Sequence, residues 1–162
     1  MKVDCAELAA SLLAGRNCVK TVVVGNSMWP LIIQGDAICI EPAGAGDVRV
    51  GDIVVFRRAK YLVAHRLVGV SRRPVSKERA DDQGGNAEEI LLLTKGDTFD
   101  SVDGPVTARD LIGRVYAVEK KRRMIPLNKG LGRFLNKLAY LLSPLSSSWL
   151  GRRNAARFED TP

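Results

Sequence analysis

The strongest constraint on the fold is that short runs of strand-forming residues are separated by turn residues throughout most of this chain. The runs that favour strands are 19–24, 37–41, 53–57, 61–70, 90–94 and 112–119. Between these runs stand Gly-Asp turns, a Gly-rich loop and the polar stretch 71–89, which we expect to be an exposed loop. Many short strands with close turns favour a mainly β fold, in which an antiparallel sheet coils into a barrel-like shape.

Helical patterns are expected at the two ends of this β body. Asp4 caps a predicted short helix that runs to about Ala14 and stops at Gly15. After Lys120, apolar residues recur at helical spacing, with basic residues on the other side. The apolar set is Leu131, Phe134, Leu135, Leu138, Leu142 and Leu145, and the basic set is Lys129, Arg133 and Lys137. We therefore expect a β body at 1–118, with its core at 19–118, and a basic amphipathic tail at 119–162.

The net charge of +7 lies in this tail. Residues 1–118 hold 15 Lys/Arg and 15 Asp/Glu, whereas residues 119–162 hold 10 Lys/Arg and 3 Asp/Glu. A neutral body with a basic tail indicates an acidic partner such as the phosphates of lipid or nucleic acid; a merely solvated basic helix is the alternative. We expect an anionic membrane surface as the partner of residues 120–153, and no specific nucleic acid.

Cys5, Cys18 and Cys39 have no metal-binding spacing, so we expect free thiols and neither a metal nor another cofactor. Asp4 and Glu7 interrupt the apolar character of the N-terminus, so it does not read as a signal peptide. No run approaches the roughly 18 apolar residues that a spanning helix needs. The expected location is therefore cytoplasmic or peripheral to a membrane.

Two residues are candidates for nucleophilic chemistry. Ser27 follows the strand-like run 19–24 in the stretch GNSMWPLI, and His65, the chain's one histidine, lies in the strand-like run YLVAHRLVGV. A catalytic serine needs a base within hydrogen-bond reach. Taken singly, each residue is more often structural, because turn serines and histidines among apolar strand residues are common. The order of the surrounding motifs changes this balance.

The ordered set SMWP, QGD, VGDIVVF, AHRLVG, LTKGD and IGRV resembles the type I signal peptidases, within the superfamily that also holds LexA-like self-cleaving repressors. The likeness covers about residues 19–118. The repressors and bacterial signal peptidases place a lysine on the strand after the VGDIVVF segment, whereas this chain has His65 there. The resemblance therefore points to the serine–histidine branch of the signal peptidases.

This resemblance implies a serine endopeptidase that removes a leader or signal segment from a precursor peptide. Ser27 would be the nucleophile and His65 the base. The acid of this branch lies six residues after the Asp of Lys-Gly-Asp, which gives Asp103. Asp97 is expected to be a structural or alternative carboxylate, and Asp100 is a weaker candidate.

The turn around Ser27 should also supply the oxyanion donors and part of the substrate groove. The backbone N–H of Ser27 is one expected donor, and Asn26 is a candidate second donor through its amide. Many relatives place a hydroxyl where this chain has Gly25. Met28 and Leu31 are candidates for lining the substrate groove, with core packing as an equal alternative.

Two further interpretations stay open at this stage. The first is a catalytically weak or inactive peptide-binding member of the same fold, which the glycine at position 25 and the absence of a membrane anchor favour. The second is a LexA-like self-cleaving regulator. Such a regulator would need a lysine base and a DNA-reading domain, and only 18 residues precede Val19.

Overall fold

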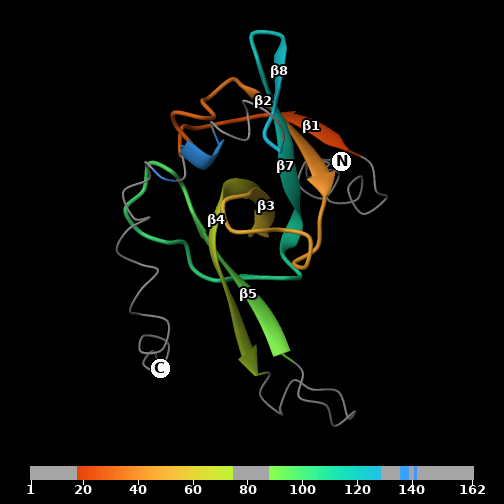
Figure 1. Ribbon diagram of the computed structural model, residues 1–162, viewed down its shortest axis with the longest axis vertical. Helices are drawn as coiled ribbons and strands as arrows, with labels where there is room; N and C mark the ends of the chain where they lie inside the picture. The colour runs from red at the N-terminus through yellow and green to blue at the C-terminus, as the bar shows by residue number, and fades with distance from the viewer. Residues whose placement is uncertain (1–17, 75–87, 129–135, 139–140, 142–162) are drawn as a thin grey trace.

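The computed structural model describes residues 18–74, 88–128, 136–138 and 141. Eight strands form one antiparallel sheet (Figure 1): β1 Val19–Val22, β2 Ala37–Pro42, β3 Ile53–Arg58, β4 Tyr61–Pro74, β5 Glu88–Lys95, β6 Val106–Thr107, β7 Leu111–Lys120 and β8 Arg123–Pro126. The strand order is β1-β2-β7-β3-β4-β5-β6, and β8 pairs with β7. The prediction of a mainly antiparallel β fold is confirmed. The described strands form an open sheet that coils without closing into a barrel.

The run Ile53-Val54-Val55-Phe56 places β3 at the centre of the sheet. All four side chains are buried. Because successive strand residues face opposite sides of a sheet, a continuous apolar run needs cover on both faces. Ile53 and Val55 belong to one core cluster and Val54 and Phe56 to another. The second cluster lies on the face of the sheet that carries the candidate site.

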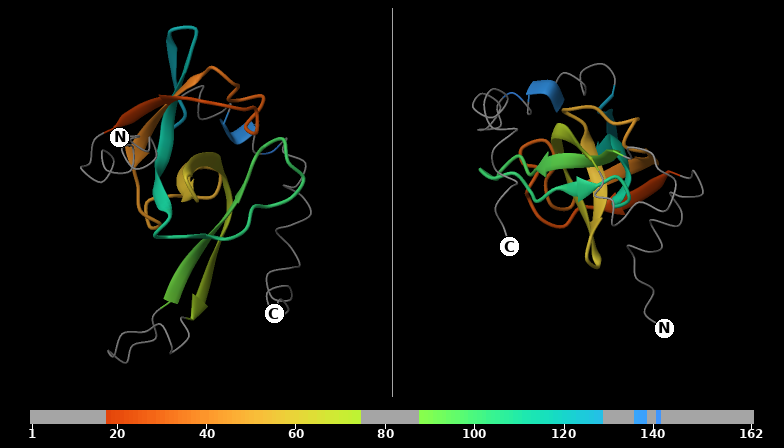
Figure 2. Two further views of the ribbon diagram at one scale, coloured as in Figure 1. Left: turned by 180° about the vertical axis from the view of Figure 1, so that it is seen from behind. Right: turned by 90° about the horizontal axis from the view of Figure 1, so that it is seen from below.

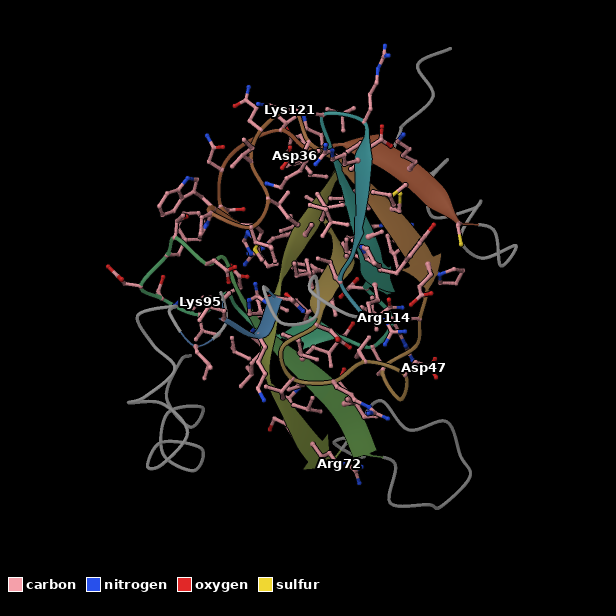
Figure 3. All side chains as sticks on the ribbon, turned by 45° about the horizontal axis from the view of Figure 1, so that its top comes forward. Asp36, Asp47, Arg72, Lys95, Arg114 and Lys121 are labelled. Carbon is pink, nitrogen blue, oxygen red and sulfur yellow. The ribbon has the colours of Figure 1, made fainter. Side chains whose placement is uncertain are left out.

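Arg114 on β7 fastens the connection between β2 and β3. Its guanidinium donates to Glu41 Oε1 at 2.6 Å and to the Asp47 carbonyl at 3.2 Å, and Figure 3 shows Arg114 and Asp47 close together. The N–H of Gly51 donates to the Leu67 carbonyl at 2.8 Å. The Gly51 turn is thus held against β4, and its carbonyl oxygen becomes available to a side chain of that strand.

β4 and β5 form a long ribbon that extends away from the rest of the sheet (Figure 1). β4 continues to Pro74 and β5 begins at Glu88, so both ends of the stretch 71–89 are strands and not the predicted loop. The sequence pattern fails here because ladder hydrogen bonds need no apolar side chains. Polar residues such as Ser71 and Arg72 pair through their backbones while their side chains stay exposed.

The sheet also continues beyond residue 118, where the sequence analysis placed the end of the body. β7 runs to Lys120, a tight turn follows at Lys121 and Arg122, and β8 pairs back onto β7. Leu127 then lies buried in the first core cluster. The basic run concealed this hairpin, because its side chains point to solvent while the backbone completes the sheet.

The terminal helices fall largely outside the described residues. The predicted helix from Asp4 to Ala14 lies wholly outside them. In the tail, residues 136–138 and 141 are helical, with Lys137 and Leu138 exposed. Within the described part of the chain, no helix has the length and apolar character required to cross a membrane.

Candidate active site

The turn that carries Ser27 is built by backbone contacts at the end of β1. Beyond β1, the Val23 N–H donates to the Asp36 carbonyl at 2.9 Å, and the Gly35 N–H donates to the Val23 carbonyl at 3.0 Å. Gly25 then turns the chain with a φ of 101°. This left-handed conformation favours glycine, so a residue with a side-chain hydroxyl would be strained here. The backbone shape of this turn accounts for the missing hydroxyl.

Asn26 braces the same turn. Its Oδ1 accepts a hydrogen bond from the Gln34 N–H at 2.9 Å, and its carbonyl accepts one from the Trp29 N–H at 3.1 Å. The side-chain oxygen of Asn26 thus ties the two sides of the loop together. The observed contacts of Asn26 hold the turn that carries Ser27. A role of the Asn26 amide in binding an oxyanion stays a prediction.

Met28 and Leu31 follow the core-packing alternative, and neither lines the cleft beside Ser27. Met28 is buried in the first core cluster, and Leu31 packs against that cluster. Trp29, by contrast, is exposed and lines a cleft beside Ser27. The Ile32 N–H donates to the Met28 carbonyl, so this segment turns about once and sends neighbouring side chains in opposite directions. That turn fixes which apolar residues face inward.

His65 lies on β4 and meets Ser27 across the cleft. Its side chain is 8% exposed, and its Nε2 lies 3.1 Å from Ser27 Oγ. The rings of Phe56 and Phe99 pack edge-on against the imidazole at centroid distances of 6.3 and 5.8 Å. The two aromatic rings hold the imidazole plane and leave its two nitrogens for polar partners.

Asp103 completes the arrangement on the other side of the imidazole. Its Oδ2 lies 2.6 Å from His65 Nδ1 and accepts a hydrogen bond from Thr94 Oγ1 at 2.8 Å. A carboxylate only accepts, so Nδ1 carries the proton and Nε2 is left to accept from Ser27. The structure therefore brings together the three residues predicted from the sequence, in the predicted order.

The loop that carries Asp103 is tied to strand β5. The Asp103 N–H donates to the Thr94 carbonyl at 2.7 Å, so Thr94 holds both the backbone and the side chain of Asp103. Arg58 Nη1 lies 3.7 Å from the other carboxylate oxygen. Burial opposes ionisation of Asp103, but the contacts from His65, Thr94 and Arg58 outweigh it and hold the pKa below its ordinary value. Asp103 is thus kept charged beside the imidazole.

Asp97 has a different partner. Its two oxygens accept from Arg66 Nε at 2.7 Å and from Nη2 at 2.6 Å, a bidentate pair whose side chains are 1% and 3% exposed. Asp97 is therefore the structural carboxylate of the site. Asp100 is exposed, and its charge acts on the buried amine of Lys95.

The Arg66–Asp97 pair joins the two catalytic segments. Arg66 follows His65 on β4, and Asp97 precedes Thr98 in the loop that leads to Asp103. The backbone N–H of Thr98 donates to the Ser27 carbonyl at 3.1 Å. A Cβ added to Gly96 would lie 3.0 Å from that carbonyl, so glycine permits the close approach. The loop that begins at Asp97 therefore contacts the turn around Ser27 and leads on to Asp103.

Replacing Asp97 with asparagine is expected to lower the free energy of unfolding by about 3–5 kcal/mol, because it leaves the buried Arg66 charge unpaired. Urea unfolding followed by tryptophan fluorescence measures this loss. Glu89→Gln is the matched control, since its partner Arg73 is exposed. A loss for Asp97→Asn no larger than that of the control would contradict a structural role.

The cleft beside Ser27 has a volume of about 1280 Å³. Its apolar lining comes from residues on both sides of the nucleophile: Val24, Trp29, Ile33, Val63 and Phe99. Arg58 lies in the wall next to Asp103. The cleft is thus lined by Ser27, His65 and an apolar surface.

Lys95 is a buried lysine at the end of β5, next to the loop that leads to Asp103. Burial lowers its pKa, and Asp97 and Asp100 oppose this effect. Thr94 faces Asp103, so strand alternation directs Lys95 to the opposite side of β5. The side chain hydrogen-bonded to Ser27 Oγ is that of His65.

Sequence reasoning missed Thr94, Arg66 and Phe99. Arg66 and Thr94 stand in motifs that carried the resemblance, AHRLVG and LTKGD, so their position next to His65 and the loop was the available signal. Phe99 had no comparable signal. Among the residues that the structure describes, no group of three or more His, Cys, Asp or Glu side chains could hold a metal ion.

Residues 3–73 match the family model described as Peptidase S24-like, and this span includes Ser27 and His65. No curated protein matches the chain. The match covers the nucleophile turn, β3 and β4, and it ends before the loop that carries Asp103. Over residues 3–73 the chain is therefore similar to the Peptidase S24-like family.

Proposed function

We propose that this protein is a serine endopeptidase of the signal-peptidase type that removes a leader or signal segment from a precursor peptide. The observation that carries the proposal is the aligned set of hydrogen bonds from Asp103 through His65 to Ser27. The peptidase family match and the neighbouring cleft support it. The histidine at the place of the lysine favours the serine–histidine branch over a self-cleaving repressor.

The reaction proceeds by acyl transfer. Ser27 Oγ attacks the scissile carbonyl while His65 Nε2 takes the hydroxyl proton. The imidazolium is stabilised by Asp103 and then gives its proton to the leaving amine. Water, activated by the same imidazole, hydrolyses the acyl-enzyme and restores Ser27. Every proton in this scheme passes through His65 Nε2, while Nδ1–H stays hydrogen-bonded to Asp103.

The tetrahedral oxyanion needs donors that are already in place. The Ser27 backbone N–H is the proposed first donor. The left-handed Gly25 brings no side-chain hydroxyl to the turn. Since one missing donor costs on the order of 10²–10³ in rate, slow turnover is expected of the isolated enzyme.

The second candidate function is peptide binding by a catalytically weak member of the same fold. The glycine at position 25 favours it, because the commoner hydroxyl donor is missing there. The short contacts among Ser27, His65 and Asp103 favour turnover. The two candidates differ in whether Ser27 becomes acylated.

A serine-directed acylating probe separates them. The expected result is one covalent adduct, located on Ser27 by peptide mass spectrometry and lost in His65→Ala. A precursor peptide with an Ala-x-Ala cleavage site should be cut by the wild type in the same preparation. Labelling of other serines at an equal rate, together with an uncut precursor, would contradict the proposal and leave peptide binding.

A further inference from the structure

We propose that Asn136 is a positioning residue through which the C-terminal segment supports the catalytic groups. The inference rests on the proposed serine-peptidase function and adds a part of the chain that the charge pattern had assigned to a membrane partner. In the left view of Figure 2 the short blue segment at 136–138 lies on the same side of the molecule as the orange loop after β1 and the green loop after β5. Its side chain reaches the buried pair beneath those loops.

Three contacts join Asn136 to the body. Arg66 Nη1 donates to Asn136 Oδ1 at 2.6 Å and reaches the Asn136 carbonyl at 3.4 Å. Asn136 Nδ2 donates to the Gly51 carbonyl at 3.3 Å. The Gly51 carbonyl also accepts from Arg66 Nη1 at 2.9 Å. Asn136 is therefore both an acceptor for the arginine and a donor to the arginine's other acceptor.

These contacts complete the environment of a buried charge. Arg66 is 1% exposed, and a guanidinium cannot lose its proton, so each N–H needs a partner inside the protein. Asp97 accepts hydrogen bonds from Nε and Nη2, while the Gly51 carbonyl and Asn136 Oδ1 accept from Nη1. Without the Asn136 side chain, Nη1 keeps the Gly51 carbonyl, which itself loses a donor, and the longer 3.4 Å contact to the backbone carbonyl of residue 136. The guanidinium then has freedom to shift.

A shift of Arg66 acts on the chemistry through its neighbours. Arg66 adjoins His65 on β4, so its position affects the base. Its partner Asp97 adjoins Thr98, whose N–H and hydroxyl lie 3.1 and 3.3 Å from the Ser27 carbonyl. Misplacement of reacting groups by about 1 Å can cost on the order of 10² in rate. Asn136 thus supports nucleophile and base together without contacting either.

The test compares Asn136→Leu with Asn136→Asp and with Lys137→Ala. Leucine has nearly the shape of asparagine but no polar atoms. Aspartate loses the donor to the Gly51 carbonyl but retains the oxygen that accepts from Arg66, and its charge attracts the guanidinium. Lys137 is an exposed neighbour in the same segment and serves as the control. We expect kcat for precursor cleavage to fall about 10- to 100-fold in Asn136→Leu with KM within about twofold. Both Asn136→Asp and Lys137→Ala should stay within about threefold of the wild-type kcat at pH 7.

A second measurement is independent of turnover. The chain has one histidine, so the imidazole N–H protons give a single set of NMR signals. Asn136→Leu should shift or broaden the His65 Nδ1–H signal and speed hydrogen exchange at the Thr98 amide, whereas Lys137→Ala should leave both unchanged. If Asn136→Leu does not fold, the same comparison is made with Asn136→Ser, which keeps one hydroxyl oxygen.

The outcomes separate the two proposals. Wild-type protein that neither cleaves nor labels, with the NMR changes still present in the Asn136 variant, contradicts the proposed function and keeps the positioning role. An Asn136→Leu variant that is folded and has a wild-type kcat overturns the positioning role. So does a loss of kcat that Asn136→Asp shares in full, because the retained oxygen would then have no effect.

Discussion

Replacing Ser27 with alanine is expected to lower kcat for precursor cleavage by about 10⁶ while leaving the fold intact. The side chain is partly buried, and its recorded side-chain partner is His65 Nε2. Loss of the hydroxyl removes the atom that forms the acyl-enzyme, so only binding and the oxyanion donors remain. His65→Ala is expected to have an effect of the same size, since the hydroxyl then has no base.

Single-turnover cleavage with enzyme in excess measures both losses. Residues that act as one unit are not additive, so the Ser27→Ala/His65→Ala double variant should be no slower than either single variant by more than about tenfold. Cys18→Ala is the control, because Cys18 is a free exposed thiol outside the cleft. Full activity in either single variant would contradict the assignment of the nucleophile and base.

Asp103→Asn is expected to lower kcat by about 10⁴, the second-largest effect. The substituted amide can donate to His65 Nδ1, which then becomes the acceptor and places the imidazole proton on Nε2. That nitrogen is no longer free to take the Ser27 proton. The His65 ring NMR signals should report this change of tautomer directly. A variant with wild-type kcat and an unchanged tautomer would show that another group orients the imidazole.

The lowered pKa of Asp103 also predicts that the free energy of unfolding depends on pH. The pKa of Asp103 is lowered from its ordinary value of 3.8, so the ionised side chain stabilises the folded state above that value. This stabilisation is lost as the pH falls below 3.8 and through the lower pKa of the folded state. The difference in free energy of unfolding between wild type and Asp103→Asn should thus shrink from pH 6 to pH 3. Urea unfolding at both pH values measures it, and a constant difference would contradict the direction of the shift.

The strands were predictable where their side chains had to be apolar. The run at 53–56 is buried on both faces, and burial of that kind leaves a direct record in residue type. β8 and the outer ends of β4 and β5 left no such record, because their polar side chains face solvent and only their backbones pair. Periodicity reports burial, and these segments form without it.

Some features of the candidate site were likewise predictable from the sequence, and others were not. One histidine in the chain left a single choice of base, and motif order led to Ser27 and Asp103. Residue type did not decide which of Met28 and Trp29 would face the core, since both are large and apolar. The turn after Ser27 sends Met28 inward and Trp29 into the cleft.

By itself, the sequence determined the mainly β fold, because residue type and turn spacing restrict it, and the resemblance to signal peptidases pointed to the candidate nucleophile, base and acid. The tertiary structure alone decided that Asp97 serves Arg66 while Asp103 serves His65, and that Asn136 meets the buried guanidinium. The physical reason is that these partners lie far apart in the chain. Their pairing depends on the distances in the folded protein and on the need to pair buried charges, and local sequence patterns do not reveal either of these.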